Sequence, residues 1–562
     1  MGAQWPRPVP LGHMPKPPST TSRRDFLATG SALAAGVALG APAIVAQPAQ
    51  FDLVVRGGEV FDGSLGAPRT GDVAIRGSRI VAVGPRIAGR TRDEVDARGL
   101  AVSPGFVDIH SHGDGSLGED PRAESVIRQG ITTIIAGQDG SSRGRDPGAI
   151  AEWRRTTQAL APSCNLATMI GLGSVRGAVV GDDDRPATAA ELQRMVGMVR
   201  RALQEGAVGA SSGLEYTPGA FASEAELIAL CRPLAARRLV YATHMRNEDD
   251  RLLDSIRESI AVARGARCGL QISHLKTQGP RNWDKLDEVF ATVDSARRGG
   301  LDIAFDRYPW IAYQTGLTNL FPVWSRDGGT AAFLRRLDDP STNGRIKQEA
   351  LAKVELIGGW DNVMIASVRD ATDRAAEGKR LGQYAASLGG DPYDVTVAML
   401  KRNQGSVGMV GFAMSEENLD RILHHPLGMV CSDGGAYAVD GPTRRGSPHP
   451  RGGGSFPRVI ARYVRERKAL TLPEAIHKMT ALPASRVRLA DRGRIAPGMA
   501  ADVIVFDANT FADTATYEQP FQYPVGLSLV VVNGRVALRG GTREGKGEGR
   551  ALGLEGGTGP RR

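Results

Sequence analysis

Between residues 104 and 486 the sequence alternates short apolar runs with longer amphipathic stretches, and this alternation restricts the possible folds more than any other feature. Runs such as GITTIIAG (130–137) and LGMVCSDGG (427–435) predict strands, because they are short, apolar and bounded by glycine or turn residues. The stretches 187–206 and 283–300 have the spacing of amphipathic helices. Strands that are apolar throughout are typical of parallel sheets covered on both faces. The repeated alternation predicts an α/β fold, specifically a (β/α)8 barrel of the TIM type.

Both ends of the chain have a different sequence pattern, in which strand-like runs are separated by glycine turns. FDLVVRGGEVFDG lies near the start and LSLVVVNGRVALRGG near the end. We therefore expect residues 47–103 and 487–540 to pair into one small β-sandwich domain, beside a barrel over 104–486. Residues 324–403 turn helical and charged, which predicts an insertion late in the barrel. Residues 541–562 are expected to form a flexible tail.

Residues 1–46 resemble a twin-arginine export signal. Arg23 and Arg24 are followed by Phe-Leu and by an apolar stretch of small residues, with candidate cleavage sites near Ala46. A membrane anchor is the alternative, but the apolar run is short for a span, so we expect no stable membrane insertion after signal removal. The translation start is Met1 or Met14. This leader predicts a protein exported to the periplasm or secreted.

The net charge of +9 does not indicate a nucleic-acid-binding protein. Residues 1–46 and 539–562 each carry +3, so the long middle of the chain is only weakly basic and has no basic runs. The four cysteines lie far apart without a Cys-x-x-Cys pair, which excludes a zinc knuckle and a dense disulfide framework. One disulfide remains an alternative in an oxidising compartment.

Several predicted strands end in a side chain that can bind a metal ion. His110 and His112 follow GFVDI, and their spacing places both imidazoles on one face of an extended chain. The other candidates, each after a later strand-like run, are Asp139, His244, His274 and Asp433. In a barrel the carboxyl ends of the strands converge on the face that carries active sites. Four imidazoles and two carboxylates suit a divalent ion such as Zn2+, although a structural role is the alternative for any single histidine.

These residues lie in motifs that resemble a known family. PGFVDIHSH (104–112) looks like the first-strand motif of the amidohydrolase superfamily. Over residues 51–540 the chain resembles the N-acyl-D-amino-acid deacylase (D-aminoacylase) branch of that superfamily. The matching segments are GLEYTPG, THMRNE, ISHLK, DRYP, SDG, HPRGGGSFPRVIARYVRE and HKMTALPASRVRLADRGRIAPGMAADVIVFD. Such long motifs in this order indicate family membership more strongly than they indicate a substrate.

The resemblance implies a metal-dependent hydrolase with one tightly held zinc ion and sometimes a second. It makes the four histidines metal ligands, and it makes Asp433 the general base that orients the attacking water and then protonates the leaving amine. This agrees with the chemistry of the residues, because zinc lowers the pKa of bound water to about 7. Proton transfer by a positioned carboxylate typically contributes ~10²–10⁴-fold in rate.

The same resemblance implies that Tyr216, Lys276 and Arg451 hold the carboxylate of the substrate. Arg451 is the best candidate, because a guanidinium binds a carboxylate through two parallel hydrogen bonds. A solvated surface lysine is the alternative for Lys276. Tyr308, in DRYP, is a further candidate for substrate binding, and packing at the barrel rim is the alternative for both tyrosines.

The chain departs from the family pattern at three places. A metal-binding cysteine is usual in a Gly-Asn-Cys-Gly turn, whereas GQDG places Asp139 there. A carboxylate can bridge two ions, so we expect one or two divalent metals, with a solvated turn aspartate as the alternative. The usual histidine of Gly-His-Gly-Ser is Leu172, and extra residues within AYAVDGPTRRG (436–446) separate SDG from HPR.

Together these features predict an exported hydrolase that cleaves the amide bond of N-acyl amino acids, N-acyl-D-amino acids included. The expected partner is a small molecule. A dipeptidase or cyclic-amide hydrolase on the same barrel is the alternative within enzymes, and a non-catalytic metal- or ligand-binding barrel is the alternative outside them. Arg451 favours acyl amino acids over hydantoin-like rings, because such rings have no free carboxylate to bind.

Overall fold

The structure is a computed structural model that describes residues 49–144 and 146–554. The export signal predicted for residues 1–46 lies outside the described residues, as does the end of the tail, 555–562. In the part of the chain that is described, no helix combines the length and the apolar character that crossing a membrane requires.

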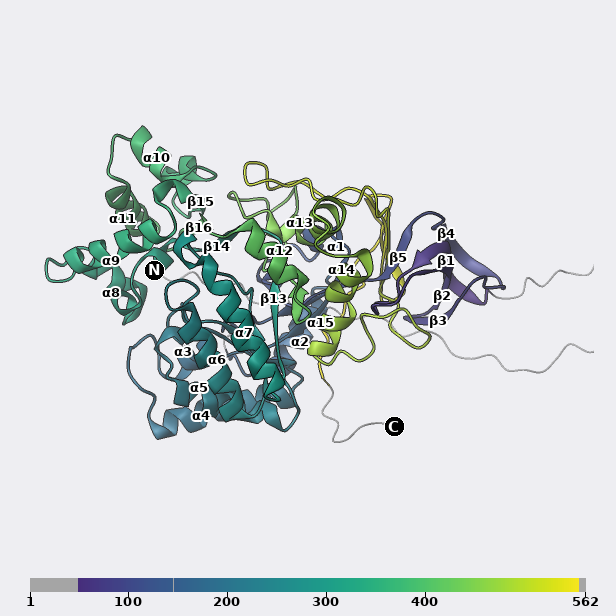
Figure 1. Ribbon diagram of the computed structural model, residues 1–562, viewed down its shortest axis with the longest axis horizontal. Helices are drawn as coiled ribbons and strands as arrows, with labels where there is room; N and C mark the ends of the chain where they lie inside the picture. The colour runs from purple at the N-terminus through teal and green to yellow at the C-terminus, as the bar shows by residue number, and fades with distance from the viewer. Residues whose placement is uncertain (1–48, 145, 555–562) are drawn as a thin grey trace, which may run out of the picture. The chain divides into compact units, whose positions relative to one another are not determined.

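The predicted (β/α)8 barrel is confirmed (Figure 1). Parallel pairing runs in the orders β6-β7-β8 and β9-β10-β11-β12-β13-β17, and β8 and β9 are two parts of one strand interrupted at Met169. Backbone hydrogen bonds close the ring between its last and first strands: the N–H of Asp433 donates to the carbonyl of His110 (2.9 Å), and the N–H of His112 donates to that of Gly434 (2.9 Å). The barrel strands are β6 (Phe106–Asp108), β7 (Ile131–Ala136), β8 (Asn165–Thr168), β9 (Ile170–Gly171), β10 (Gly209–Gly213), β11 (Val240–His244), β12 (Gly269–Ile272), β13 (Ile303–Arg307) and β17 (Gly428–Val430).

Helices cover the outside of the ring, and their ends follow from the sequence. At the start of α4 the Thr188 side chain accepts a hydrogen bond from the N–H of Glu191, and the Glu191 carboxylate accepts one from the N–H of Thr188, which is a capping box. Its buried residues Met195, Val199 and Ala202 recur every three or four positions. The helices of the barrel are α1 (Glu124–Ile127), α2 (Ile150–Ala159), α3 (Leu172–Val179), α4 (Ala189–Gln204), α5 (Glu224–Ala235), α6 (Leu252–Ala266), α7 (Leu286–Arg298), α12 (Glu416–His424), α13 (Arg451–Arg458), α14 (Leu472–Met479) and α15 (Ala481–Arg486).

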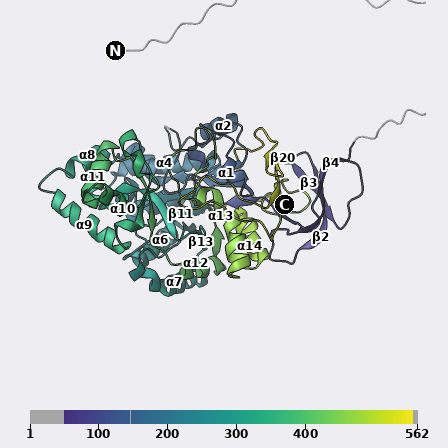
Figure 2. The same cartoon turned by 90° about the horizontal axis from the view of Figure 1, so that it is seen from above.

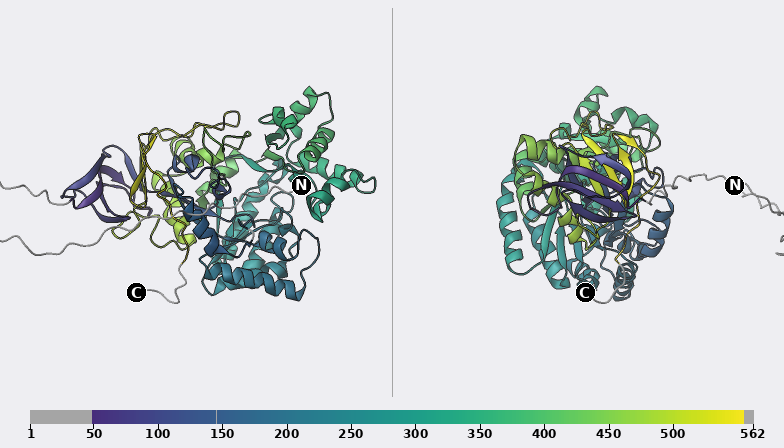
Figure 3. Two further views of the ribbon diagram at one scale, coloured as in Figure 1. Left: turned by 180° about the vertical axis from the view of Figure 1, so that it is seen from behind. Right: turned by 90° about the vertical axis from the view of Figure 1, so that its right-hand side faces the viewer.

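The N- and C-terminal strand-rich segments join in one hydrogen-bonded sheet. Its order is β21-β20-β19-β18-β5-β1-β2-β3, with β4 beside β1. The two segments meet where β18 pairs antiparallel with β5, and Figure 3 shows the purple N-terminal strands beside the yellow C-terminal ones. The strands are β1 (Phe51–Val60), β2 (Arg69–Arg76), β3 (Arg79–Gly84), β4 (Thr91–Asp96), β5 (Ala101–Pro104), β18 (Val503–Phe506), β19 (Leu527–Val532), β20 (Arg535–Arg539) and β21 (Thr542–Arg543).

The insertion after β13 begins earlier than predicted and contains a small sheet besides its helices. The strands β14 (Ala312–Gly316), β16 (Gly408–Phe412) and β15 (Val363–Ser367) pair antiparallel in that order. The inserted helices are α8 (Gly329–Arg336), α9 (Asn343–Leu356), α10 (Leu381–Ser387) and α11 (Pro392–Arg402), gathered at one end of the view in Figure 2. The sheet was missed because its strands pair only with segments far away in the sequence.

Residues 541–554 are not the free tail that the sequence suggested. The N–H of Leu166 donates to the carbonyl of Arg550 (2.9 Å), and the N–H of Leu552 donates to the carbonyl of Leu166 (2.6 Å), so this segment lies along β8. Its small and polar residues are typical of tails, but backbone pairing of this kind needs no particular side chains.

Candidate active site

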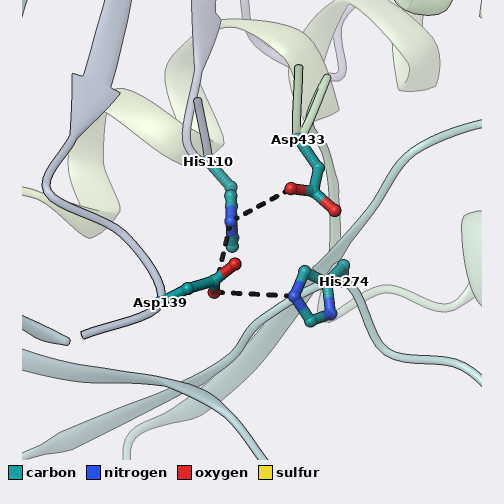
Figure 4. A group of neighbouring side chains, drawn as sticks. All are labelled: His110, Asp139, His274 and Asp433. Carbon is teal, nitrogen blue, oxygen red and sulfur yellow. Dashed lines mark ion pairs between the residues drawn. The ribbon is translucent and has the colours of Figure 1, made fainter. Parts of the chain in front are cut away.

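The structure brings the five predicted metal ligands and the predicted catalytic Asp433 together at the carboxyl end of the barrel, with Asp139 at their centre. Figure 4 shows His110, Asp139, His274 and Asp433 of this group. One Asp139 oxygen, Oδ1, lies 3.4 Å from His110 Nε2 and 3.5 Å from His274 Nε2. The other, Oδ2, lies 3.3 Å from His112 Nε2 and 3.9 Å from His244 Nδ1. The carboxylate that replaces the usual cysteine therefore faces all four imidazoles.

Asp433 completes this group from the last strand of the barrel. Its Oδ1 lies 3.1 Å from His112 Nε2 and 3.5 Å from His110 Nε2. Its Oδ2 accepts a hydrogen bond from Arg451 Nη1 at 2.6 Å. One carboxylate oxygen thus faces the imidazoles while the other is held by a guanidinium.

Three of these side chains leave the backbone at left-handed positions. The φ angles are 52° at Asp139, 36° at His274 and 49° at Asp433. Non-glycine residues rarely adopt positive φ, and such conformations cluster at functional sites. Here each one occurs directly after a barrel strand, where the chain turns away from the ring and its side chain stays over the centre.

The buried polar atoms at this centre fit a bound cation. Both ring nitrogens of His110 and Oδ1 of Asp139 are buried without a hydrogen-bond partner in the described protein. Nδ1 of His244 and Nε2 of His274 lie only 3.0 Å apart. Buried imidazoles and carboxylates normally have partners, and this set of nitrogen and oxygen donors suits Zn2+.

Three buried carboxylates behind the imidazoles were not predicted from the sequence. Glu248 Oε1 lies 3.1 Å from His274 Nδ1, and Glu215 Oε2 lies 3.5 Å from His244 Nε2. Asp306 lies 3.6 Å from His110 Nδ1. Each carboxylate faces the ring nitrogen that points away from the centre, which leaves the inner nitrogen free as a ligand. The four-residue spacing between His244 and Glu248 was the signal in the sequence.

The electrostatics of the site keep Asp433 ionised and raise the pKa of His110, His112 and His244. Burial raises the pKa of Asp433, but the charges of Arg451 and His110 outweigh it and hold that pKa well below its usual range. Burial lowers the pKa of His112, but its hydrogen bonds with Asp139 and Asp433 raise it to about 9. An ionised Asp433 is able to accept a proton at neutral pH.

The four predicted substrate-binding residues line the same cavity, which has a volume of about 710 Å³. Tyr308 Oη and Arg451 Nε are buried donors without a partner in the described protein, and the Arg451 guanidinium lies 4.7 Å from the Tyr308 ring centre. Lys276 Nζ contacts Glu248 Oε1 (2.6 Å) and His274 Nδ1 (2.7 Å), so it is not a surface lysine. The hydroxyl of Tyr216 accepts a hydrogen bond from Thr315 (3.3 Å).

The other departures from the family pattern lie outside the cavity. Leu172 is buried in the hydrophobic core at the start of α3, whereas its neighbours Gly173 and Ser174 line the cavity. No residue of 436–446 lines the cavity, although Gly435 does. All four cysteines are buried and free, so the alternative of a disulfide is wrong.

Comparisons with known proteins agree with this geometry. The model of the amidohydrolase family matches residues 93–316 and 436–538. N-acyl-D-glutamate deacylase of Alcaligenes xylosoxydans xylosoxydans is 36% identical over 86% of this chain and 93% of its own length. D-aminoacylase of the same organism is 32% identical over 89% of this chain and 97% of its own length. The crystal structure of N-acyl-D-glutamate deacylase from Bordetella bronchiseptica, complexed with zinc and a phosphonate mimic of the tetrahedral intermediate, superposes with a TM-score of 0.76 and 33% identity, covering 90% of this chain and all of that one.

Proposed function

The chain belongs to the amidohydrolase family, and from this premise we propose that it is a zinc-dependent hydrolase of N-acyl-D-amino acids. It would cleave the amide bond to give a carboxylic acid and a free amino acid. The observation that carries the proposal is the cavity in which Asp139, Asp433 and the imidazoles of the metal group meet the side chains of Tyr308 and Arg451. The relatives named for N-acyl-D-amino-acid substrates support the same activity.

His110, His112, Asp139, His244 and His274 would hold the metal. Bound zinc supplies a Lewis acid for the amide carbonyl and lowers the pKa of a water to about 7. Asp433 accepts the proton of the attacking water at its carboxylate and passes it to the amide nitrogen, so that the C–N bond breaks with a neutral amine as leaving group.

The substrate is oriented by groups that do not take part in proton transfer. Arg451 and Tyr308 line the cavity and would donate hydrogen bonds to the α-carboxylate of the substrate. They lie beside Asp433, because Arg451 binds Asp433 and contacts the Tyr308 ring. A fixed carboxylate places the amide carbon over the metal centre, and such positioning contributes to rate by removing orientational freedom.

The activity is tested with purified protein loaded with zinc and a panel of N-acetyl-D- and N-acetyl-L-amino acids. We expect amine release from the D series, loss of turnover after removal of zinc with a chelator, and recovery when zinc is added back. Tight binding of these amides without any turnover would instead indicate a non-catalytic binding barrel.

We propose that the site holds one or two zinc ions, because each oxygen of Asp139 faces two of the four imidazoles. Metal analysis of the wild type and Asp139→Ala counts the ions. A fall in zinc per chain supports a bridging carboxylate, and unchanged zinc content contradicts it.

We also propose that the protein is exported through the twin-arginine route, on the basis of Arg23, Arg24 and the small apolar residues that follow them. Replacing both arginines by lysine should retain the protein in the cytoplasm. Cell fractionation with N-terminal sequencing of the exported form measures this, and export of the variant would contradict it.

A further inference from the structure

The wall of the catalytic cavity, as far as the chain is described, lacks aliphatic side chains larger than that of proline. None of the described residues that line it is Leu, Ile, Val, Met, Phe, Trp or Ala. The wall consists instead of glycines, tyrosines, one proline and polar groups such as Ser174, Gln278 and Asn319. Ligand sites are usually lined by apolar side chains, and an apolar substrate would find few such partners here.

Four carboxylates line this wall, and two of them, Asp139 and Glu215, have no lysine or arginine of the described chain within 4.0 Å; Asp139 would bind the metal, which leaves Glu215. Lys276 pairs with Glu248 at 2.6 Å, and Arg451 pairs with Asp433 at 2.6 Å. Glu215 also lines the cavity. Among the described residues no lysine or arginine lies within 4.0 Å of its carboxylate, whose Oε2 instead accepts a hydrogen bond from Asn319 (3.0 Å).

Cations near Glu215 belong to a neighbouring cavity of about 290 Å³, which Glu215 and Asn319 also line. Arg326 and Lys353 line that second cavity and not the catalytic one. Arg326 Nη2 donates to the backbone carbonyl of Glu215 (3.1 Å), and Lys353 pairs with Asp249 at 2.5 Å. They stabilise the negative charge of Glu215 without offering a cation to the substrate.

We propose that Glu215 selects a substrate that carries a cationic group, an amine or a guanidinium, away from the scissile amide. This inference rests on the proposed function and adds the substrate class. A second carboxylate on the substrate would meet Glu215 and no unpaired cation of the catalytic cavity, whereas an ammonium or guanidinium would form a charge-assisted hydrogen bond there. The chain would thus differ from its relative named for D-glutamate, despite 36% identity.

The cation can belong to the amino-acid side chain or to the acyl group, and paired substrates distinguish these. N-acetyl-D-lysine is compared with the D-norleucine, D-glutamine and D-glutamate derivatives, and N-(4-aminobutanoyl)-D-glutamine with N-pentanoyl-D-glutamine. We expect kcat/KM at least tenfold higher for the cationic member of one pair, and the lowest value for D-glutamate. Equal or lower kcat/KM for the cationic member of both pairs, or the highest value for the D-glutamate derivative, would overturn the proposal.

Three variants distinguish the effect of the Glu215 charge on substrate preference from the effect of the shape of its side chain. Glu215→Gln should bring the ratio of cationic to neutral kcat/KM close to one, and Glu215→Asp, which keeps the charge, should retain most of it. Glu349→Gln, an acid that lines only the neighbouring cavity, should leave the ratio unchanged. A ratio that survives in Glu215→Gln contradicts the role of Glu215.

Calorimetric binding of the product amino acids tests the charge preference even if no amide is hydrolysed. For the wild type we expect D-lysine to bind at least tenfold more tightly than D-glutamate, or 4-aminobutanoate more tightly than pentanoate if the cation is on the acyl side. Tighter binding of D-glutamate and of pentanoate contradicts the inference. Absence of turnover on every substrate contradicts the proposed function instead.

Discussion

At the scale of single residues, the two carboxylate oxygens of Asp433 have different partners. Oδ1 faces the imidazoles of His110 and His112, and Oδ2 is held by Arg451. Arg451 also carries the free Nε donor suited to the substrate carboxylate. The proton acceptor and the substrate anchor are therefore one hydrogen-bonded unit.

Asp433→Asn keeps the shape of this unit but removes the negative charge that accepts a proton. We expect kcat to fall by ~10²–10⁴-fold, because that is the usual contribution of a positioned acid–base group. Zinc content should stay at the wild-type level, because the four imidazoles and Asp139 remain. Steady-state kinetics and metal analysis of the same preparation measure both quantities, and a fall in kcat of less than tenfold would rule out the role of Asp433.

Glu248→Gln removes the negative charge that lies 3.1 Å from the outer nitrogen of His274. Zinc affinity should fall by ~10–100-fold, because such carboxylates fix the tautomer and raise the basicity of a histidine ligand. Competition with a chelator of known affinity measures this. Glu288→Gln, at an exposed glutamate that pairs with Arg257, is the control and should bind zinc as the wild type does; equal affinity in all three proteins would show that Glu248 has no such role.

At the scale of elements, the sequence predicted what depends on local pattern and missed what depends on distant partners. β7 and β12 were found because their apolar runs are buried on both faces. The strand β16 was missed because its partners β14 and β15 are recognisable only once the insertion has folded. The convergence of the histidines followed from the barrel itself, whereas Glu215 looks like an ordinary polar loop residue until its imidazole partner is seen, and Glu248 is marked only by its four-residue spacing from His244.

Helix α14 carries a buried lysine that makes stability depend on pH. Lys478 Nζ donates to the carbonyls of His425 (2.6 Å) and Gly428 (2.9 Å), and burial lowers its pKa to about 8. An unfolded lysine titrates near 10.4, so between these values the unfolded chain binds more protons than the folded one. The contribution of Lys478 to the free energy of unfolding therefore rises with pH in this window.

Comparison with Lys478→Met isolates this effect. From pH 7.5 to 9.5 we expect the wild type to gain about 2 kcal/mol in unfolding free energy relative to the variant. Urea unfolding at the two pH values measures it. A difference between the two proteins that is independent of pH would show that the Lys478 ammonium is not destabilised by burial.

At the scale of the whole molecule, one buried polar network connects the β domain to the barrel. Asp502, just before β18, forms an ion pair with Arg492 and accepts hydrogen bonds from Asn165 Nδ2 (3.0 Å) and from the N–H of Asn533 (2.6 Å). Asn165 begins barrel strand β8, and Asn533 lies in the turn after β19. The network therefore fixes the C-terminal segment of the β domain against the barrel at β8.

Asp502→Ala should destabilise the protein by about 3–5 kcal/mol, because it leaves the buried guanidinium of Arg492 without its carboxylate. The exposed pair Asp96–Arg98 supplies the control, since Asp96→Ala should change stability by less than about 1 kcal/mol. Denaturant unfolding of both variants tests this. A similar small loss in both would mean that the buried network contributes little.

The last barrel strand, which closes the ring by its hydrogen bonds to the first, is synthesised late. This determines when during synthesis the active site can be completed. The imidazoles of His110 and His112 leave the ribosome early, whereas Asp433 is synthesised only after the insertion between them is complete. A nascent or prematurely terminated chain can carry histidines that attract a metal, but it lacks the acid–base group and the last strand. Incomplete chains are therefore inert, and catalytic competence arrives in a single late step of biosynthesis.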